Sequence, residues 1–208
     1  VGDEEKRALA AALERLGTPL AVRSSASDED IAGRSAAGQY ETVLGVRTLR
    51  ELVDAVERCY RSAESERVLA YRGRAQTALA LVFQREVPAT RAGVAFSVDP
   101  LGGDRANVVL EVVFGPGERL VSGAVDPDRY WVSRDLARVR SRLAEKPDVP
   151  ARRRFSRTLR DDEAVQVAEL VLRAEDGFEL PVDVEFCFHG PAVWLVQCRP
   201  ITTLDAAR

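Results

Sequence analysis

The spacing of apolar residues divides the chain into a first part with helical periodicity and a second part with the periodicity of strands. Apolar positions three and four residues apart predict a helix over residues 3–16. A second helix is predicted over residues 48–63, where Thr48 and Glu51 are spaced as a capping box. A third helix is predicted over residues 64–75. The first part of the chain should therefore be mainly helical.

From Thr77 onward the apolar period becomes two, which is typical of β-strands. The predicted strands cover residues 20–22, 40–46, 78–87, 93–98, 107–114, 129–133, 182–188 and 192–198. A charged connector over residues 137–158 precedes a predicted helix over residues 161–175. This order predicts an α+β fold with a mostly antiparallel sheet and flanking helices. We expect one domain over residues 1–208, with approximate lobes 1–76 and 77–208.

Composition and charge narrow the class of protein. The chain is 46% hydrophobic and 30% charged, as is usual for globular proteins, and no apolar run reaches the roughly 20 residues of a membrane span. A net charge of −3 disfavours a nucleic-acid partner. The charged helical pattern at the start is not that of a signal peptide. The three cysteines show no metal-ligand spacing, and their odd number disfavours a disulfide framework. We expect a cytoplasmic protein without nucleic-acid or membrane partners. Methionine is absent even at position 1, which suggests a fragment or a processed chain.

The last two predicted strands form a hairpin that brings polar side chains together. Asp183 and Glu185 share one face of the first strand, and Gln197 and Arg199 share one face of the second. A three-residue turn at residues 190–192 would place Glu185 opposite Gln197 and Asp183 opposite Arg199. A two-residue turn would send the acids and the Gln/Arg pair to opposite faces. We predict the first arrangement.

This polar set has a chemical use. Carboxylate and amide oxygens from Glu185 and Gln197 suit Mg²⁺, which binds through few protein ligands together with substrate phosphates. The guanidinium of Arg199 can offer a bidentate fork to a phosphoryl group. A surface hairpin with a cross-strand salt bridge is the alternative, and the spacing alone leaves both open. The opposite face is apolar and should pack inward, through Val184, Phe186, Trp194 and Val196.

Five motifs, in the same order along the chain, resemble those of one known family. Residues 183–186 and 195–202 resemble the "DIEW…LQSRPIT" ending of its ATP-binding domain. The other similar segments are residues 21–30 ("VRSSA…ED"), 37–42 ("AGQ-ET"), 93–100 ("GV-FT-DP") and 115–130 ("GLGE", "VSG", "PD-Y"). The chain thus resembles the ATP-grasp-like domain of pyruvate phosphate dikinase, phosphoenolpyruvate synthase and rifampicin phosphotransferase. The resemblance implies ATP and Mg²⁺ as cofactors.

The resemblance also implies roles for individual residues. It makes Glu185 and Gln197 the Mg²⁺ ligands and places Asp183 in the nucleotide-binding set. It makes Arg23 and Arg199 the catalytic residues, because Arg23 would contact the ATP phosphates and Arg199 would stabilise the transferring phosphoryl group. Phosphoryl transfer needs such positioning and charge neutralisation more than covalent chemistry.

Three further residues enter the nucleotide site by the same resemblance. Gly38 and Gln39 belong to the glycine loop, where a residue without a Cβ lets backbone N–H groups approach phosphates. Gln84 would lie beside the adenine-binding segment. The family's phosphate-binding lysine comes from a glycine-rich segment, and neither Lys6 nor Lys146 fits that role. We therefore expect an ATP-grasp-like fold that lacks part of its N-terminal lobe.

The function implied by the family is transfer of a phosphoryl group from ATP to a small-molecule acceptor, by way of a histidine on a separate domain. The only histidine here, His189, falls at a hairpin turn and is expected to be a turn residue. Pyruvate, an antibiotic hydroxyl group and other metabolites all remain open as acceptors. An ATP-grasp carboxylate–amine ligase and a non-catalytic nucleotide-binding module are the alternatives. The ligase would release ADP, whereas the dikinase type releases AMP and phosphate.

Overall fold

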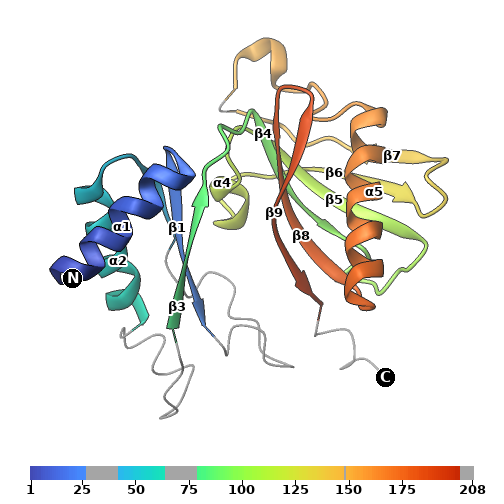
Figure 1. Ribbon diagram of the computed structural model, residues 1–208. Coiled ribbons are helices and arrows are strands. Elements are labelled where there is room, and N and C mark those ends of the chain that lie inside the picture. The colour runs from blue at the N-terminus through green and yellow to red at the C-terminus, as the bar shows by residue number, and fades with distance from the viewer. Residues whose placement is uncertain (27–41, 64–78, 148, 202–208) are drawn as a thin grey trace. The chain divides into compact units, whose positions relative to one another are not determined.

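The computed structural model describes residues 1–26, 42–63, 79–147 and 149–201. The chain forms two compact units, Val1–Glu86 and Val87–Arg208, each with its own sheet and its own hydrophobic core (Figure 1). The boundary differs from the one expected near residue 76, because the last strand of the first unit pairs along its length with an earlier strand of that unit. The predicted helix over residues 64–75 lies outside the described residues.

The first unit packs two helices on a three-stranded antiparallel sheet of order β2-β1-β3. Its elements are α1 (Asp3–Leu16), β1 (Leu20–Ala26), β2 (Thr42–Val46), α2 (Leu49–Ala63) and β3 (Leu79–Arg85). The predicted capping box is confirmed, since the Thr48 N–H donates to Glu51 Oε2 at 3.0 Å and the Glu51 N–H donates to Thr48 Oγ1 at 3.2 Å. Apolar residues of α2 and β1, such as Leu52 and Val22, are fully buried in its core.

The second unit holds a six-stranded antiparallel sheet of order β7-β6-β5-β4-β8-β9. Its strands are β4 (Arg91–Phe96), β5 (Asn107–Phe114), β6 (Asp128–Ser133), β7 (Val139–Arg142), β8 (Val182–His189) and β9 (Ala192–Pro200). The helices are α4 (Glu118–Val121) and α5 (Asp161–Phe178), with a 3₁₀ turn at Ala151–Arg153. Helix α5 lies along one face of the sheet (Figure 1). We call the face opposite α5 the site face.

The core of the second unit forms between α5 and the sheet. Buried side chains of four strands, β4, β5, β6 and β8, meet the buried face of the helix there, including Phe186 and Phe188 of β8. Gly93 of β4 makes room for this packing, because a Cβ at that position would lie 2.8 Å from the Phe186 ring and 2.4 Å from the Glu111 carbonyl oxygen. The α+β class with antiparallel sheets is confirmed.

Two elements of the second unit differ from the prediction. Strand β7 lies within the segment expected to be a charged connector. It contains a single apolar residue, Val139, so its sequence shows no alternation. Helix α5 continues through Gly177 and ends at Phe178. The C-cap residue, Glu179, adopts a left-handed conformation with φ of 55°. Within the described ranges, no helix combines the length and apolar character that a bilayer crossing requires.

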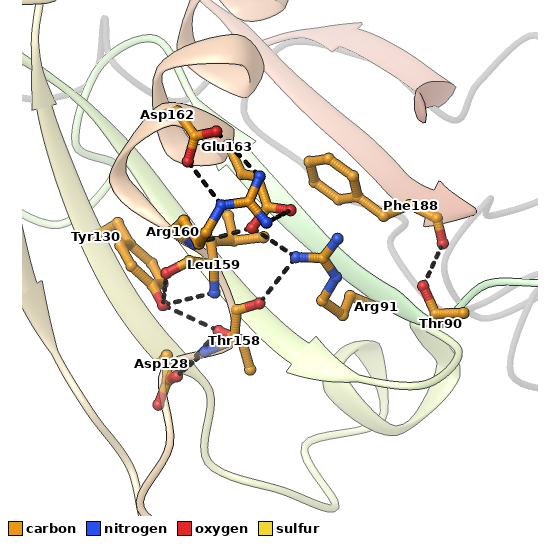
Figure 2. A network of polar contacts seen from close by, with 10 residues as sticks. All are labelled: Thr90, Arg91, Asp128, Tyr130, Thr158, Leu159, Arg160, Asp162, Glu163 and Phe188. Carbon is orange, nitrogen blue, oxygen red and sulfur yellow. Dashed lines mark hydrogen bonds and ion pairs between the residues drawn. The ribbon is translucent and has the colours of Figure 1, made fainter. Parts of the chain in front are cut away.

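A buried carboxylate fixes the connector between β7 and α5 to the sheet. Asp128, at the start of β6, is fully buried and accepts hydrogen bonds from the Ala144 N–H at 2.8 Å and from Lys146 Nζ at 2.6 Å. Its second oxygen accepts from the N–H and the hydroxyl group of Thr158, both at 2.9 Å. The neighbouring Tyr130 hydroxyl accepts the Leu159 N–H at 2.9 Å (Figure 2). The connector thus enters α5 from a fixed position.

A second polar pair joins β4 to the first turn of α5 (Figure 2). Arg91 Nη1 donates to Glu163 Oε2 at 2.7 Å and to the Thr158 carbonyl oxygen at 3.2 Å. Glu163 Oε2 also accepts the Arg160 N–H at 2.9 Å, which satisfies a backbone donor at the helix start. Burial by itself would raise the pKa of the Glu163 carboxyl group. The hydrogen bonds from Arg91 and Arg160 and their positive charges nevertheless hold that pKa below its ordinary value of 4.5.

This lowered pKa makes the stability of the second unit depend on pH. A carboxyl group with a lower pKa in the folded chain stabilises the fold fully above its ordinary pKa, and that stability is lost as the pH falls through the folded-state value. We expect Glu163→Gln to lower the free energy of unfolding by about 2 kcal/mol at pH 7. The difference from the unaltered chain should shrink below pH 4.5, the ordinary value.

Urea unfolding between pH 3 and pH 7 measures this difference. Glu169→Gln is the matched control, because Glu169 lies on the exposed side of α5. A Glu163→Gln effect that stayed constant across this pH range would contradict the assignment.

Candidate nucleotide and metal site

The hairpin of β8 and β9 brings the predicted polar residues together in cross-strand pairs. Glu185 is paired with Gln197, and Asp183 is paired with Arg199. Arg199 Nη2 donates to Asp183 Oδ2 at 3.3 Å, and both side chains are about three-quarters buried. The predicted pairing is therefore confirmed, and all four residues lie on the site face.

The hairpin reaches this pairing by a different route from the predicted one. His189 pairs with Ala192, so the turn contains two residues, Gly190 and Pro191, and the predicted three-residue turn is wrong. Gly190 has a φ of 60°, which glycine adopts without strain. A shift of register beyond Glu185 then adds one residue to β9, in the manner of a β-bulge. The bulge restores the parity that the short turn would have reversed.

The bulge changes the face that the tip of β9 presents. Leu195 is opposite Phe186, and Trp194 is opposite Cys187, so Val196 is the extra residue. Trp194 therefore shares the site face with Glu185 and is 49% exposed. The prediction that Trp194 packs inward is wrong, and Val193 packs against the core of the second unit instead.

The inward packing predicted for β8 is confirmed, because Val184 and Phe186 are buried against α5. The two cysteines of the hairpin are free, and they lie on opposite faces, since Cys187 is opposite Trp194 and Cys198 is opposite Val184.

Neighbouring strands extend the site face beyond the hairpin. Val94 of β4 lies beside Glu185, and Glu111 of β5 lies beside Val94 in the same row of the sheet. Glu111 Oε1 accepts hydrogen bonds from Arg129 of β6, one of them from Nε at 3.0 Å. The carboxylate of Glu111 is thus neutralised by a partner of its own. Across its own row of the sheet, Glu185 has Gln197 and Val94 as neighbours.

Two predicted residues belong to the first unit. Arg23 of β1 is opposite Val82, and Gln84 of β3 is opposite Ala21, so Arg23 and Gln84 share one face of that sheet. The other face carries Leu20 and Val22, which pack against α1 and α2. Gly38 and Gln39 lie outside the described residues.

The remaining candidates for phosphoryl chemistry have structural partners. Lys146, in the segment expected to be a charged connector, is only 8% exposed and is paired with Asp128. His189 ends β8 beside the turn, as expected, and its Nδ1 lies 2.9 Å from the Pro88 carbonyl oxygen.

The donor set of the hairpin fits a hard divalent cation. Glu185 offers a carboxylate and Gln197 an amide oxygen, both of which Mg²⁺ accepts. In the part of the chain that the structure describes, no three or more His, Cys, Asp or Glu residues gather around a possible metal position. Two protein ligands would leave the other positions of the cation to phosphate oxygens and water, as is usual for Mg²⁺ bound with a nucleotide.

The α+β fold with antiparallel sheets and the polar hairpin have the features expected of a nucleotide-binding domain. Residues 3–208 match the family model described as "Pyruvate phosphate dikinase, AMP/ATP-binding domain". The chain belongs to this family.

Individual relatives extend the comparison. The chain is 38% identical to a rifampicin phosphotransferase of Streptomyces sp., over 97% of the chain and 26% of that protein. It is 34% identical to a probable phosphoenolpyruvate synthase of Methanothermobacter thermautotrophicus, over 90% of the chain and 30% of that protein. The prodigiosin synthesizing transferase PigC of Serratia marcescens is 36% identical over 90% of the chain and 23% of that protein. The chain thus spans about a quarter of the length of these relatives.

Proposed function

We propose that the chain binds Mg·ATP and serves as the ATP-binding part of a dikinase-type phosphotransferase. The observation that carries the proposal is the pairing of Glu185 with Gln197 beside Asp183 and Arg199 on one face of the sheet. Family membership supports the use of ATP. The phosphoryl group would pass to a histidine on a separate domain and then to a small-molecule acceptor.

Each residue of the hairpin has a distinct part in this function. The carboxylate of Glu185 and the amide oxygen of Gln197 would hold Mg²⁺, which neutralises phosphate charge when it is bound. Asp183 orients the Arg199 guanidinium through their hydrogen bond. Arg199 can then direct its remaining donors to the phosphoryl group as charge develops on it. In the first unit, Arg23 would contribute a phosphate contact and Gln84 a contact near the adenine.

The identity of the acceptor differs among the relatives. The names of those relatives include a rifampicin phosphotransferase and probable phosphoenolpyruvate synthases, so the acceptor here is either an antibiotic hydroxyl group, pyruvate or another small metabolite. A carboxylate–amine ligase would use the same metal and phosphate residues but would form a different product. We also propose a cytoplasmic location, because the three cysteines of the described chain are free thiols.

Calorimetry of the chain with ATP, in the presence and absence of Mg²⁺, tests the proposed function. We expect Mg²⁺-dependent binding, and a folded chain that binds no nucleotide would refute the proposal. The products formed with a histidine-carrying acceptor domain test the reaction class. AMP and phosphate would support the dikinase type, whereas ADP would indicate a ligase.

A further inference from the structure

The bulge in β9 places one aromatic side chain on the same face as the metal and phosphate residues. In a regular strand, residues 194 and 197 would point to opposite faces, because they are separated by an odd number of positions. The extra residue at Val196 removes this opposition, so Trp194 and Gln197 both lie on the site face. Bulges are common beside active sites, where they redirect side chains.

Trp194 remains accessible although it is the largest apolar side chain of β9. Its relative exposure is 49%, whereas its cross-strand partner Cys187 is 5% exposed. Its neighbour Val193, on the other face, packs against the core of the second unit. Exposure of a large aromatic surface on the site face leaves it available to a ligand.

The position of Trp194 relative to the polar residues suggests which ligand this is. Cys187 follows Glu185 by two residues on β8, so the Trp194–Cys187 pair lies about 7 Å along the sheet from the Glu185–Gln197 pair. Arg199, Gln197 and Trp194 therefore follow one another along β9, as a guanidinium, a metal ligand and an aromatic ring. A nucleotide presents phosphates, a chelated cation and a flat base in the same order.

We propose that Trp194 stacks on the adenine base of the bound nucleotide; this rests on the proposed function of the hairpin. Aromatic side chains stack on bases through their π faces, and loss of one such contact typically costs about tenfold in affinity. Trp194 thus recognises the base, while Arg199 recognises the phosphates. The two ends of the nucleotide are read by two residues of one strand.

Paired variants and ligands separate the two roles. We expect Trp194→Leu to weaken Mg·ATP binding about tenfold and to leave the binding of Mg²⁺ with inorganic triphosphate unchanged. Arg199→Ala should have the opposite pattern, with triphosphate binding weakened more than adenosine binding. Trp194→Phe retains an aromatic ring and should retain most of the affinity for ATP. Calorimetry measures the affinity of each variant for ATP, adenosine and triphosphate.

The second tryptophan supplies the matched control. Trp131 of β6 also lies on the site face, but it is flanked by the guanidinium groups of Arg129 and Arg140 at 5.9 and 5.8 Å from its ring centre. Trp131→Phe should leave binding unchanged and make Trp194 the only tryptophan of the chain. ATP, but not triphosphate, should then change the tryptophan fluorescence.

The possible outcomes decide between the two proposals. Equal losses for ATP and triphosphate in folded Trp194→Leu, or no loss for ATP, would overturn base stacking and leave the proposed function intact. Such a result would make Trp194 a structural residue or a contact for another domain. Absence of any nucleotide or triphosphate binding by the unaltered, folded chain would overturn the proposed function, and base stacking with it.

Discussion

Replacing Glu185 with glutamine is expected to abolish most Mg²⁺-dependent nucleotide binding while the chain stays folded. The substitution keeps the size of the side chain and removes its charge, and with it the only carboxylate of the Glu185–Gln197 pair. Charge on the ligands largely determines the affinity of an oxygen site for a divalent cation. We expect a loss of at least about 100-fold in affinity for Mg·ATP, since even changes to groups around metal ligands cost 10–100-fold.

Calorimetry and thermal unfolding of the same samples measure this effect. In the absence of Mg²⁺, the variant and the unaltered chain should bind ATP with similar, low affinity. Glu169→Gln removes the same charge from the exposed side of α5 and should have no effect on binding. An equal loss of affinity with and without Mg²⁺ would show that Glu185 acts on the nucleotide or on the fold rather than through a cation.

Replacing Asp128 with asparagine should have the largest effect on stability. Asp128 is fully buried and accepts four hydrogen bonds, one of them from the nearly buried Lys146. Asparagine would leave the lysine charge buried without a counter-charge, and the loss of one partner of a buried pair costs about 3–5 kcal/mol. In a unit of this size, such a loss lowers the Tm by on the order of 10 °C.

Two companion variants identify the cause of this loss. Asp162→Asn alters another aspartate in an ion pair, but its pair with Arg160 is mostly exposed and should contribute little to stability. Combining Asp128→Asn with Lys146→Met removes the unpaired charge and should recover part of the stability. If Asp128→Asn lowers the Tm no more than Asp162→Asn, the buried pair does not stabilise the connector.

The sequence was sufficient to predict the pairing of the proposed metal ligands but not the path of the hairpin. The strict alternation of β8 identified Asp183 and Glu185 as neighbours on one face. The bulge was not predictable, because an extra residue interrupts the period on which the prediction depends. Without the bulge, Trp194 was predicted to pack inward, and its apolar character favoured the same position. That prediction is wrong for this reason.

Long-range polar pairs were the other features that the sequence did not reveal. Lys146 occurs in a charged segment, directly before Pro147, and its sequence context is that of a solvated residue. Its burial depends on Asp128 of β6, which is distant in the sequence and becomes a neighbour only after the sheet has formed. Arg91 and Glu163 are likewise distant in the sequence and become neighbours only in the folded chain. Such contacts depend on tertiary packing rather than on local periodicity.

A longer turn without a bulge and a shorter turn with a bulge give the same cross-strand pairs at the base of the hairpin but different side chains at its tip. The base and the tip can therefore change independently during evolution. The pairs of Glu185 with Gln197 and of Asp183 with Arg199 are the same in a three-residue turn without a bulge and in the observed two-residue turn with one. Only the tip differs, because the longer turn would present Leu195 on the site face and the shorter turn presents Trp194. A change in the turn would therefore replace an aromatic contact with an aliphatic one without moving a proposed cation ligand. The tip of the hairpin is thus a position where ligand selectivity can change while the proposed cation and phosphate contacts stay the same.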